Sequence, residues 1–117
     1  MNSREKALHI AEILSSKKAK ELQVIGIENL TLIADYFVIC TGTSTTQVKA
    51  LAGIVEEKMS EAGDPPLRVE GFKTAGWILC DFGNVVVHIF TNEMREFYGL
   101  ERLWSDGEKI EIDFDED

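Results

Sequence analysis

The sequence predicts an α/β fold in which helices flank a mixed β-sheet. Stretches with the apolar spacing of an amphipathic helix alternate with short runs rich in β-branched and aromatic residues. One such run, residues 36–41, is nearly all apolar, as expected of a strand buried on both faces. Two further runs flank Gly83-Asn84, a pair typical of hairpin turns. Because the chain has 117 residues, 44% of them hydrophobic, we expect one domain over residues 1–117.

Four elements are expected before the first proline. They are a helix over residues 4–20, strands over residues 22–28 and 36–41, and a helix that begins after Ser44. Ser3 is the candidate N-cap of the first helix. Ser44 and Gln47 fit a capping box, in which each side chain bonds the other residue's backbone N–H. A short strand around residues 67–71 should then lead into the hairpin.

The hairpin over residues 77–90 is the most informative stretch. In the register that its turn sets, one face carries only apolar side chains and must be core: Ile78, Cys80, Phe82, Val85, Val87 and Ile89. The other face mixes aromatic, acidic and imidazole groups: Trp77, Leu79, Asp81, Val86, His88 and Phe90. We interpret this mixed face as a surface that meets a partner, because Trp is among the residues that most often anchor interfaces.

The chain is expected to close with a short helix and an acidic tail. Asn92 is the candidate cap of a helix over residues 93–98, and a further turn follows over residues 100–104. Residues 105–117 hold seven acids against Lys109 alone, and so carry most of the net charge of −9. Their weak alternation allows an edge strand, but we expect the last four residues to be loose.

Charge and composition narrow the possible partners. A chain this acidic is a poor binder of nucleic-acid backbones, so we expect no direct sequence-specific nucleic acid binding and favour a basic protein surface. With no apolar run of membrane-spanning length and no targeting leader, the sequence indicates a cytoplasmic protein without membrane contact. Cys40 and Cys80 lie in apolar runs as core thiols, and their spacing from the histidines makes no zinc pattern.

Two enzymatic interpretations of the sequence have less support than a partner-binding function. Gly42-Thr43-Ser44 lies between a strand and a helix, where phosphate-binding loops occur, but the lysine of such loops is missing. Nucleotidyltransferases need two strand carboxylates for Mg²⁺, and here Glu70 is followed by Phe72 where the second acid would fall. We therefore assign no catalytic, cofactor-binding or metal-binding residue. A divergent nucleotidyltransferase-like enzyme that binds nucleotide at residues 42–44 remains the alternative, and a module that only self-associates is a third.

Several blocks of the sequence resemble the RsfS/Iojap family. They are residues 35–44 with Gln47-Val48, Glu70-Gly71, residues 77–90, residues 95–98 and residues 100–104. Their order and spacing match the family over most of the chain. Asn84 departs from the family pattern, which usually has an Asp after the hairpin glycine, although Asn serves the turn equally well.

The resemblance implies both a fold and a function. It implies a nucleotidyltransferase-like topology that lacks the catalytic carboxylate pair. It also implies a ribosomal silencing factor that binds a basic large-subunit protein at the intersubunit face, blocks subunit joining and represses translation under nutrient limitation. A homodimer is expected when the protein is free. Matched by position, Trp77 and Tyr98 are the partner-contacting aromatics, and the residues placed around them are Glu70, Asp81, His88, Phe90, Glu96 and Glu101.

Overall fold

The computed structural model describes residues 1–114, and within that range the chain forms four helices and six strands. In chain order these are α1 (Ser3–Ser16), β1 (Lys20–Gly26), β2 (Tyr36–Gly42), α2 (Thr45–Glu61), β3 (Arg68–Glu70), β4 (Trp77–Asp81), β5 (Val85–Thr91), α3 (Asn92–Tyr98), α4 (Leu100–Leu103) and β6 (Glu108–Ile110).

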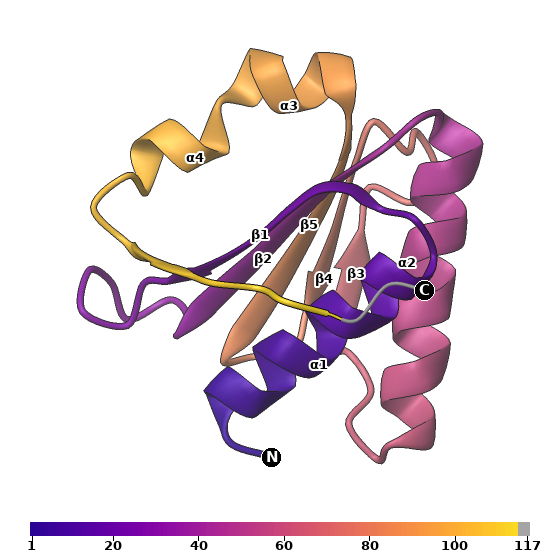
Figure 1. Ribbon diagram of the computed structural model, residues 1–117. Helices are drawn as coiled ribbons and strands as arrows, with labels where there is room; N and C mark the ends of the chain where they lie inside the picture. The colour runs from indigo at the N-terminus through magenta and orange to yellow at the C-terminus, as the bar shows by residue number, and fades with distance from the viewer. Residues whose placement is uncertain (115–117) are drawn as a thin grey trace.

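The strands form one sheet in the order β3-β4-β5-β2-β1-β6. Strands β2 and β5 pair in parallel, and the other neighbours pair antiparallel. Figure 1 shows α1 and α2 over one face of the sheet and α3 and α4 over the other. The sheet confirms the mixed α/β class that the sequence predicts.

The β4–β5 hairpin has the predicted register. Ile78 pairs with Ile89 and Cys80 with Val87, and all six side chains of the predicted core face are buried. They pack with α1 and α2 in the larger of two apolar clusters. A second cluster, which includes Phe90, lies on the opposite face beneath α3 and α4. The fold therefore buries apolar side chains on both faces of the sheet.

The first helix differs from the prediction at both ends. Its cap is Asn2 and not Ser3, because the Asn2 side chain accepts from the Glu5 N–H at 2.8 Å and the Glu5 carboxylate accepts from the Asn2 N–H at 3.0 Å. The helix ends at Ser16 and not at residue 20, because Lys18 has a φ of 67°, outside the right-handed helical region.

The caps of α2 and α3 are also set by side-chain hydrogen bonds. Ser44 Oγ accepts from the Gln47 N–H at 3.1 Å, as predicted. The Gln47 amide oxygen accepts from the Thr43 N–H and not from Ser44, so the reciprocal half of the box lies one residue earlier. Thr91 caps α3, one position before the predicted Asn92.

The acidic segment contributes an edge strand. Strand β6 pairs antiparallel with β1, with Val24 opposite Ile110. The expectation of a loose end is wrong at Phe114, which packs against the larger cluster. Residues 115–117, the rest of that expectation, lie outside the described residues. Among residues 1–114, no helix is long and apolar enough to cross a membrane.

Candidate functional site

Four side chains meet where β4, β5 and α3 converge, and we call them the aromatic group (Trp77, His88, Phe90, Tyr98). Trp77 and Phe90 are opposite each other in the hairpin, with ring centroids 5.1 Å apart. Because Thr91 caps α3 directly after β5, this short helix brings Tyr98 back over Trp77, at 4.6 Å between centroids. The His88 ring lies 5.8 Å from Trp77.

Only part of the aromatic group reaches the surface. Tyr98 is 44% exposed and Trp77 is half-buried, whereas Phe90 is 0% and His88 3% exposed. The expectation that the whole mixed face of the hairpin meets a partner therefore needs correction, because the chain's own α3 and α4 lie over that face (Figure 1). At the surface, the aromatic group presents half-buried Trp77 from the hairpin and exposed Tyr98 from α3.

His88 is held by Trp77 and not by an acid. The Trp77 indole N–H donates to His88 Nδ1 at 3.1 Å, and the Phe37 ring meets the imidazole edge-on at 4.7 Å. Burial lowers the pKa of His88 to about 4. The side chain is therefore a neutral imidazole at neutral pH, and it makes no Asp–His pair with Asp81.

Glu70 and Asp81 belong to a charged group at the β3 edge of the sheet. Arg68 Nε lies 3.1 Å from the Glu70 carboxylate and 3.2 Å from the Asp81 carboxylate. Asp81 also accepts from the Gly83 N–H at 2.8 Å, which fixes the hairpin turn. Strand β3 is the neighbour of β4, so this charged group lies beside the strand that carries Trp77.

Glu96 and Glu101 lie around Arg95, whose guanidinium is buried. Arg95 donates to the Glu101 carboxylate at 3.1 and 3.3 Å, to Thr41 Oγ1 at 2.8 Å and to the Glu21 carbonyl at 2.7 Å. These bonds join α3 to α4, β2 and β1. Glu96 is exposed and lines a polar pocket of about 450 Å³ beside this ion pair. Glu101 therefore has a structural partner, while the Glu96 carboxylate faces solvent.

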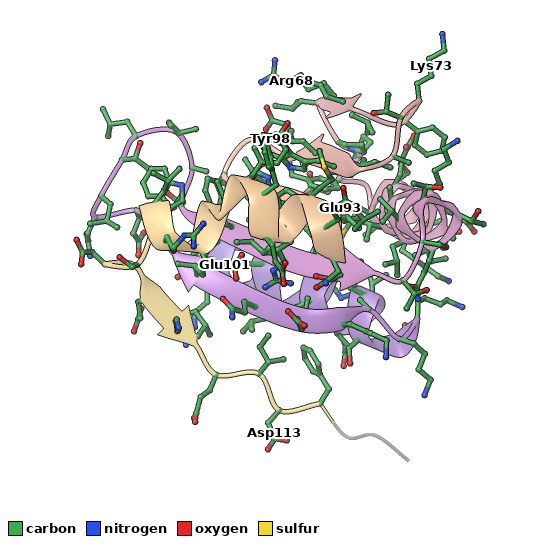
Figure 2. The ribbon with its side chains drawn as sticks, turned by 90° about the horizontal axis from the view of Figure 1, so that it is seen from above. Arg68, Lys73, Glu93, Tyr98, Glu101 and Asp113 are labelled. Carbon is green, nitrogen blue, oxygen red and sulfur yellow. The ribbon has the colours of Figure 1, made fainter. Side chains whose placement is uncertain are left out.

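Figure 2 places Tyr98 and Glu101 on opposite sides of α3. The structure thus divides the eight predicted site residues among three places. Trp77, Tyr98, His88 and Phe90 form the aromatic group, Glu70 and Asp81 pair with Arg68, and Glu96 and Glu101 surround Arg95. Apolar side chains with at least two-thirds exposure occur on α3, α4 and the loops before β2 and β3: Phe97, Leu103, Leu32, Ile33 and Leu67.

A model of the family RsfS, described as ribosomal silencing factor during starvation, matches residues 1–117. The chain belongs to the RsfS family. Ribosomal silencing factor RsfS of Bacillus subtilis (strain 168) is 38% identical over 114 residues, 97% of each chain. A crystal structure of a Chromobacterium violaceum protein matches with a TM-score of 0.88 and 34% identity, covering 98% of this chain and 95% of that chain. Mitochondrial assembly of ribosomal large subunit protein 1 of Mus musculus is 32% identical over 99 residues, 82% of this chain and 43% of the mouse protein.

Membership of the RsfS family supports a ribosome-associated role in silencing translation, which is regulatory and not catalytic. In the loop considered for nucleotide binding, Gly42 lies directly against Val48 of α2. A side-chain carbon at Gly42 would lie 2.9 Å from Val48 Cγ2, and the Ser44 hydroxyl is used as the cap of α2. Glu70 is paired with Arg68, and Phe72 lies in the turn after β3.

Metal and thiol chemistry find little support in the described residues. Within residues 1–114, no group of three or more His, Cys, Asp or Glu side chains is placed to hold a metal ion. Burial raises the pKa of both Cys40 and Cys80 to about 12, so neither thiol is ionised near neutral pH. Both cysteines are buried, as predicted from their apolar surroundings.

Sequence reasoning missed the roles of Arg95 and Trp104 in holding the aromatic group in position. Arg95 pairs with Glu101 six positions on, in a separate helix, which is outside the spacing that reveals helical ion pairs. Trp104 meets Phe37 edge-on at 5.4 Å, a contact between segments far apart in the sequence. No local pattern reveals either contact, although the nearly all-apolar run of residues 36–41 placed Phe37 in a strand expected to be buried on both faces.

Proposed function

We propose that this protein binds a basic protein of the large ribosomal subunit at the intersubunit face, through a surface centred on Trp77 and Tyr98. Bound there, it would occupy space that the small subunit needs, block subunit joining and lower translation under nutrient limitation. Membership of a silencing family supports this proposal, as does the large-subunit assembly role in the name of the mouse relative.

The observation that carries the proposal is the aromatic pair of exposed Tyr98 and half-buried Trp77. Trp77 and Tyr98 are large rings, 4.6 Å apart, that are held in place from below by Phe90 and His88. Aromatic side chains that are fixed before binding lose little conformational freedom on association, which is why Trp and Tyr dominate interface hot spots. A pair in this position supplies affinity without a deep cleft.

Charge gives the proposal its preference for a basic partner. Glu93 and Glu96 are exposed on α3, the helix that carries Tyr98 (Figure 2). The net charge of −9 adds a long-range attraction, although much of it comes from the acidic segment at the β6 edge, across the sheet from β4. We expect these charges to speed encounter and the aromatic pair to hold the complex.

A subunit-joining assay tests the blocking role. Purified large and small subunits are mixed at a Mg²⁺ concentration that favours joining, and the fraction of joined ribosomes is followed by light scattering. We expect the protein to reduce that fraction in proportion to its occupancy of large subunits. Tyr98→Ala should lose about tenfold or more in potency, as expected for an interface anchor.

The matched control is Phe72→Ala. Phe72 is 47% exposed, close to the 44% of Tyr98, but its ring lies beside Lys49 of α2, a helix on the sheet face opposite α3. This variant should block joining as well as the unmodified protein does. If Phe72→Ala and Tyr98→Ala lose equal potency, or if the unmodified protein leaves joining unchanged, the proposed function fails.

A further inference from the structure

A pocket of about 320 Å³ lies on the sheet face beside the aromatic group. Its buried wall is mainly apolar, with Leu79 and Val86 from the hairpin and Phe37 from β2. Ile33 and Leu67 also line it and are 67% and 75% exposed. Apolar pockets bordered by exposed apolar side chains are typical of binding surfaces.

His88 lines this pocket, and its bond to Trp77 determines which ring nitrogen carries the proton. An indole N–H can only donate, so His88 Nδ1 accepts and must be the unprotonated nitrogen. The neutral ring then carries its proton on Nε2. The group that His88 presents on its other side is therefore a hydrogen-bond donor.

That donor has no hydrogen-bond partner among the described residues, although the atom is buried. The two nitrogens of an imidazole lie on different sides of the ring, so Nε2 lies on the side away from Trp77, and His88 lines the pocket together with Asp81 and Val86. The Asp81 carboxylate accepts from Arg68 and from a backbone N–H instead. Because buried polar groups are almost always paired, the bare N–H indicates an acceptor supplied from outside.

We infer that the pocket widens on binding, by movement of its exposed side chains, and receives a backbone carbonyl oxygen of the partner protein, which accepts from the otherwise buried His88 Nε2–H while an adjacent apolar side chain fills the remaining space. The inference rests on the proposed function and names the group that the partner inserts. Lysine and arginine of a basic partner carry only donors and cannot satisfy this N–H. Asp81 and Arg68 both line the pocket and pair with each other, so neither charge favours a carboxylate over a neutral carbonyl oxygen. A small ligand would leave Ile33 and Leu67 in water, whereas a protein segment covers them.

Two substitutions with amide side chains distinguish the roles of the two ring nitrogens of His88. In His88→Asn the short side chain ends where Nδ1 was, so it keeps an acceptor for Trp77 but leaves the pocket without a donor. In His88→Gln the longer side chain ends where Nε2 was, so it keeps a donor at the pocket but loses the Trp77 bond. Denaturation midpoints of both variants establish that each is folded, and binding to purified large ribosomal subunits is then measured.

Both variants change a residue of the aromatic group, so we expect both to bind more weakly than the unmodified protein, and His88→Asn, which lacks the donor, to bind about tenfold more weakly than His88→Gln. Equal binding by all three proteins, or a larger loss with His88→Gln, overturns the inference and leaves the proposed function standing. If the unmodified protein itself binds no large subunits, the proposed function has failed and the inference falls with it.

A surface variant keeps the test decisive if a buried substitution prevents folding. Leu67 is exposed, so Leu67→Gln removes an apolar wall of the pocket with little effect on the core. We expect it to weaken large-subunit binding about fivefold, in line with a lost apolar contact. Phe72→Gln, outside the pocket, should bind normally. Unchanged binding by Leu67→Gln overturns the inference.

Discussion

At the scale of single residues, the structure assigns His88 a neutral and buried role. Its pKa of about 4 in the folded protein lies below the ordinary value of 6.5 because burial disfavours the charged ring. Protonation would also place a proton on Nδ1 and break the bond from the Trp77 indole. The aromatic group therefore loses its support when His88 is forced to take up a proton.

This assignment gives a direction for the pH dependence of stability. Below pH 6.5 the unfolded chain protonates at His88 while the folded chain does not, so stability should fall as the pH drops from about 6.5 to about 4 and be unaffected by this group above that range. The full contribution is roughly 3 kcal/mol. Urea denaturation of the unmodified protein and of His88→Gln across this range measures it. If the free energies of unfolding of the two proteins change with pH in parallel, the assignment of His88 as a buried neutral side chain is wrong.

Trp77 and Ile78 are neighbours in β4, but we assign Trp77 to the binding surface and Ile78 to the core. Ile78 is 0% exposed in the larger cluster, so Ile78→Ala should lower the free energy of unfolding by about 2–5 kcal/mol and affect binding only through unfolding. Trp77→Ala should weaken large-subunit binding about thirtyfold. Because Trp77 is half-buried and bonds His88, we also expect about 2 kcal/mol of lost stability, less than for a fully buried Trp. If Trp77→Ala unfolds the chain while Ile78→Ala leaves it stable, the assignment of the core face and the binding face is the wrong way round.

At the scale of elements, α3 and α4 are positioned by apolar packing and by the ion pair between Arg95 and Glu101. Helix α3 has seven residues and α4 has four, too short to be stable by themselves. Arg95 ties both to the sheet through Glu101, Thr41 and the Glu21 carbonyl. Since Tyr98 ends α3, this ion pair helps to hold Tyr98 over Trp77.

Removing the guanidinium should therefore loosen the site. Arg95→Met leaves Glu101 and Thr41 without their partner, and we expect a loss of about 2–3 kcal/mol in the free energy of unfolding, together with weaker binding. Arg102→Gln, an exposed change on the neighbouring helix, should stay within about 0.5 kcal/mol. Denaturation curves of both variants measure the difference, and equal stability would show that Arg95 does not anchor these helices.

The sequence predicts most of the elements because their signals are local. The hairpin register follows from alternation and from Gly83-Asn84, and the start of α2 follows from Ser44 and Gln47. The covering of Phe90 by α3 and α4 could not be predicted in this way, because it depends on contacts between separate elements. The same reason explains why Trp77 and Tyr98 could be singled out by resemblance and residue type, while their support by His88 and Arg95 could not.

At the scale of the whole molecule, the charge is unevenly distributed across the sheet. The acidic segment pairs at the β6 edge, whereas the aromatic pair lies near the β3 edge, where Arg68 offsets Glu70 and Asp81. The net charge of −9 thus acts mainly at long range, and the aromatic surface acts on contact.

This separation predicts a specific response to salt. Raising the ionic strength screens exposed charges, so the association rate with large subunits should fall while the dissociation rate changes little. Tyr98→Ala should do the reverse, with a faster dissociation and a nearly unchanged association rate. Stopped-flow or biosensor kinetics at two or three salt concentrations resolve the two rates. A dissociation rate that rises steeply with salt would show that charge pairs, and not the aromatic pair, hold the complex.

The central claim, that Trp77 and Tyr98 form the surface that holds the large subunit, is tested most directly by sedimentation with separated subunits. We expect the unmodified protein to co-sediment with large subunits and not with small ones, and Tyr98→Ala, shown to be folded by its denaturation curve, to remain in the supernatant at the same concentration. Equal sedimentation with both subunits or with neither, or full retention of folded Tyr98→Ala on the large subunit, would contradict this account.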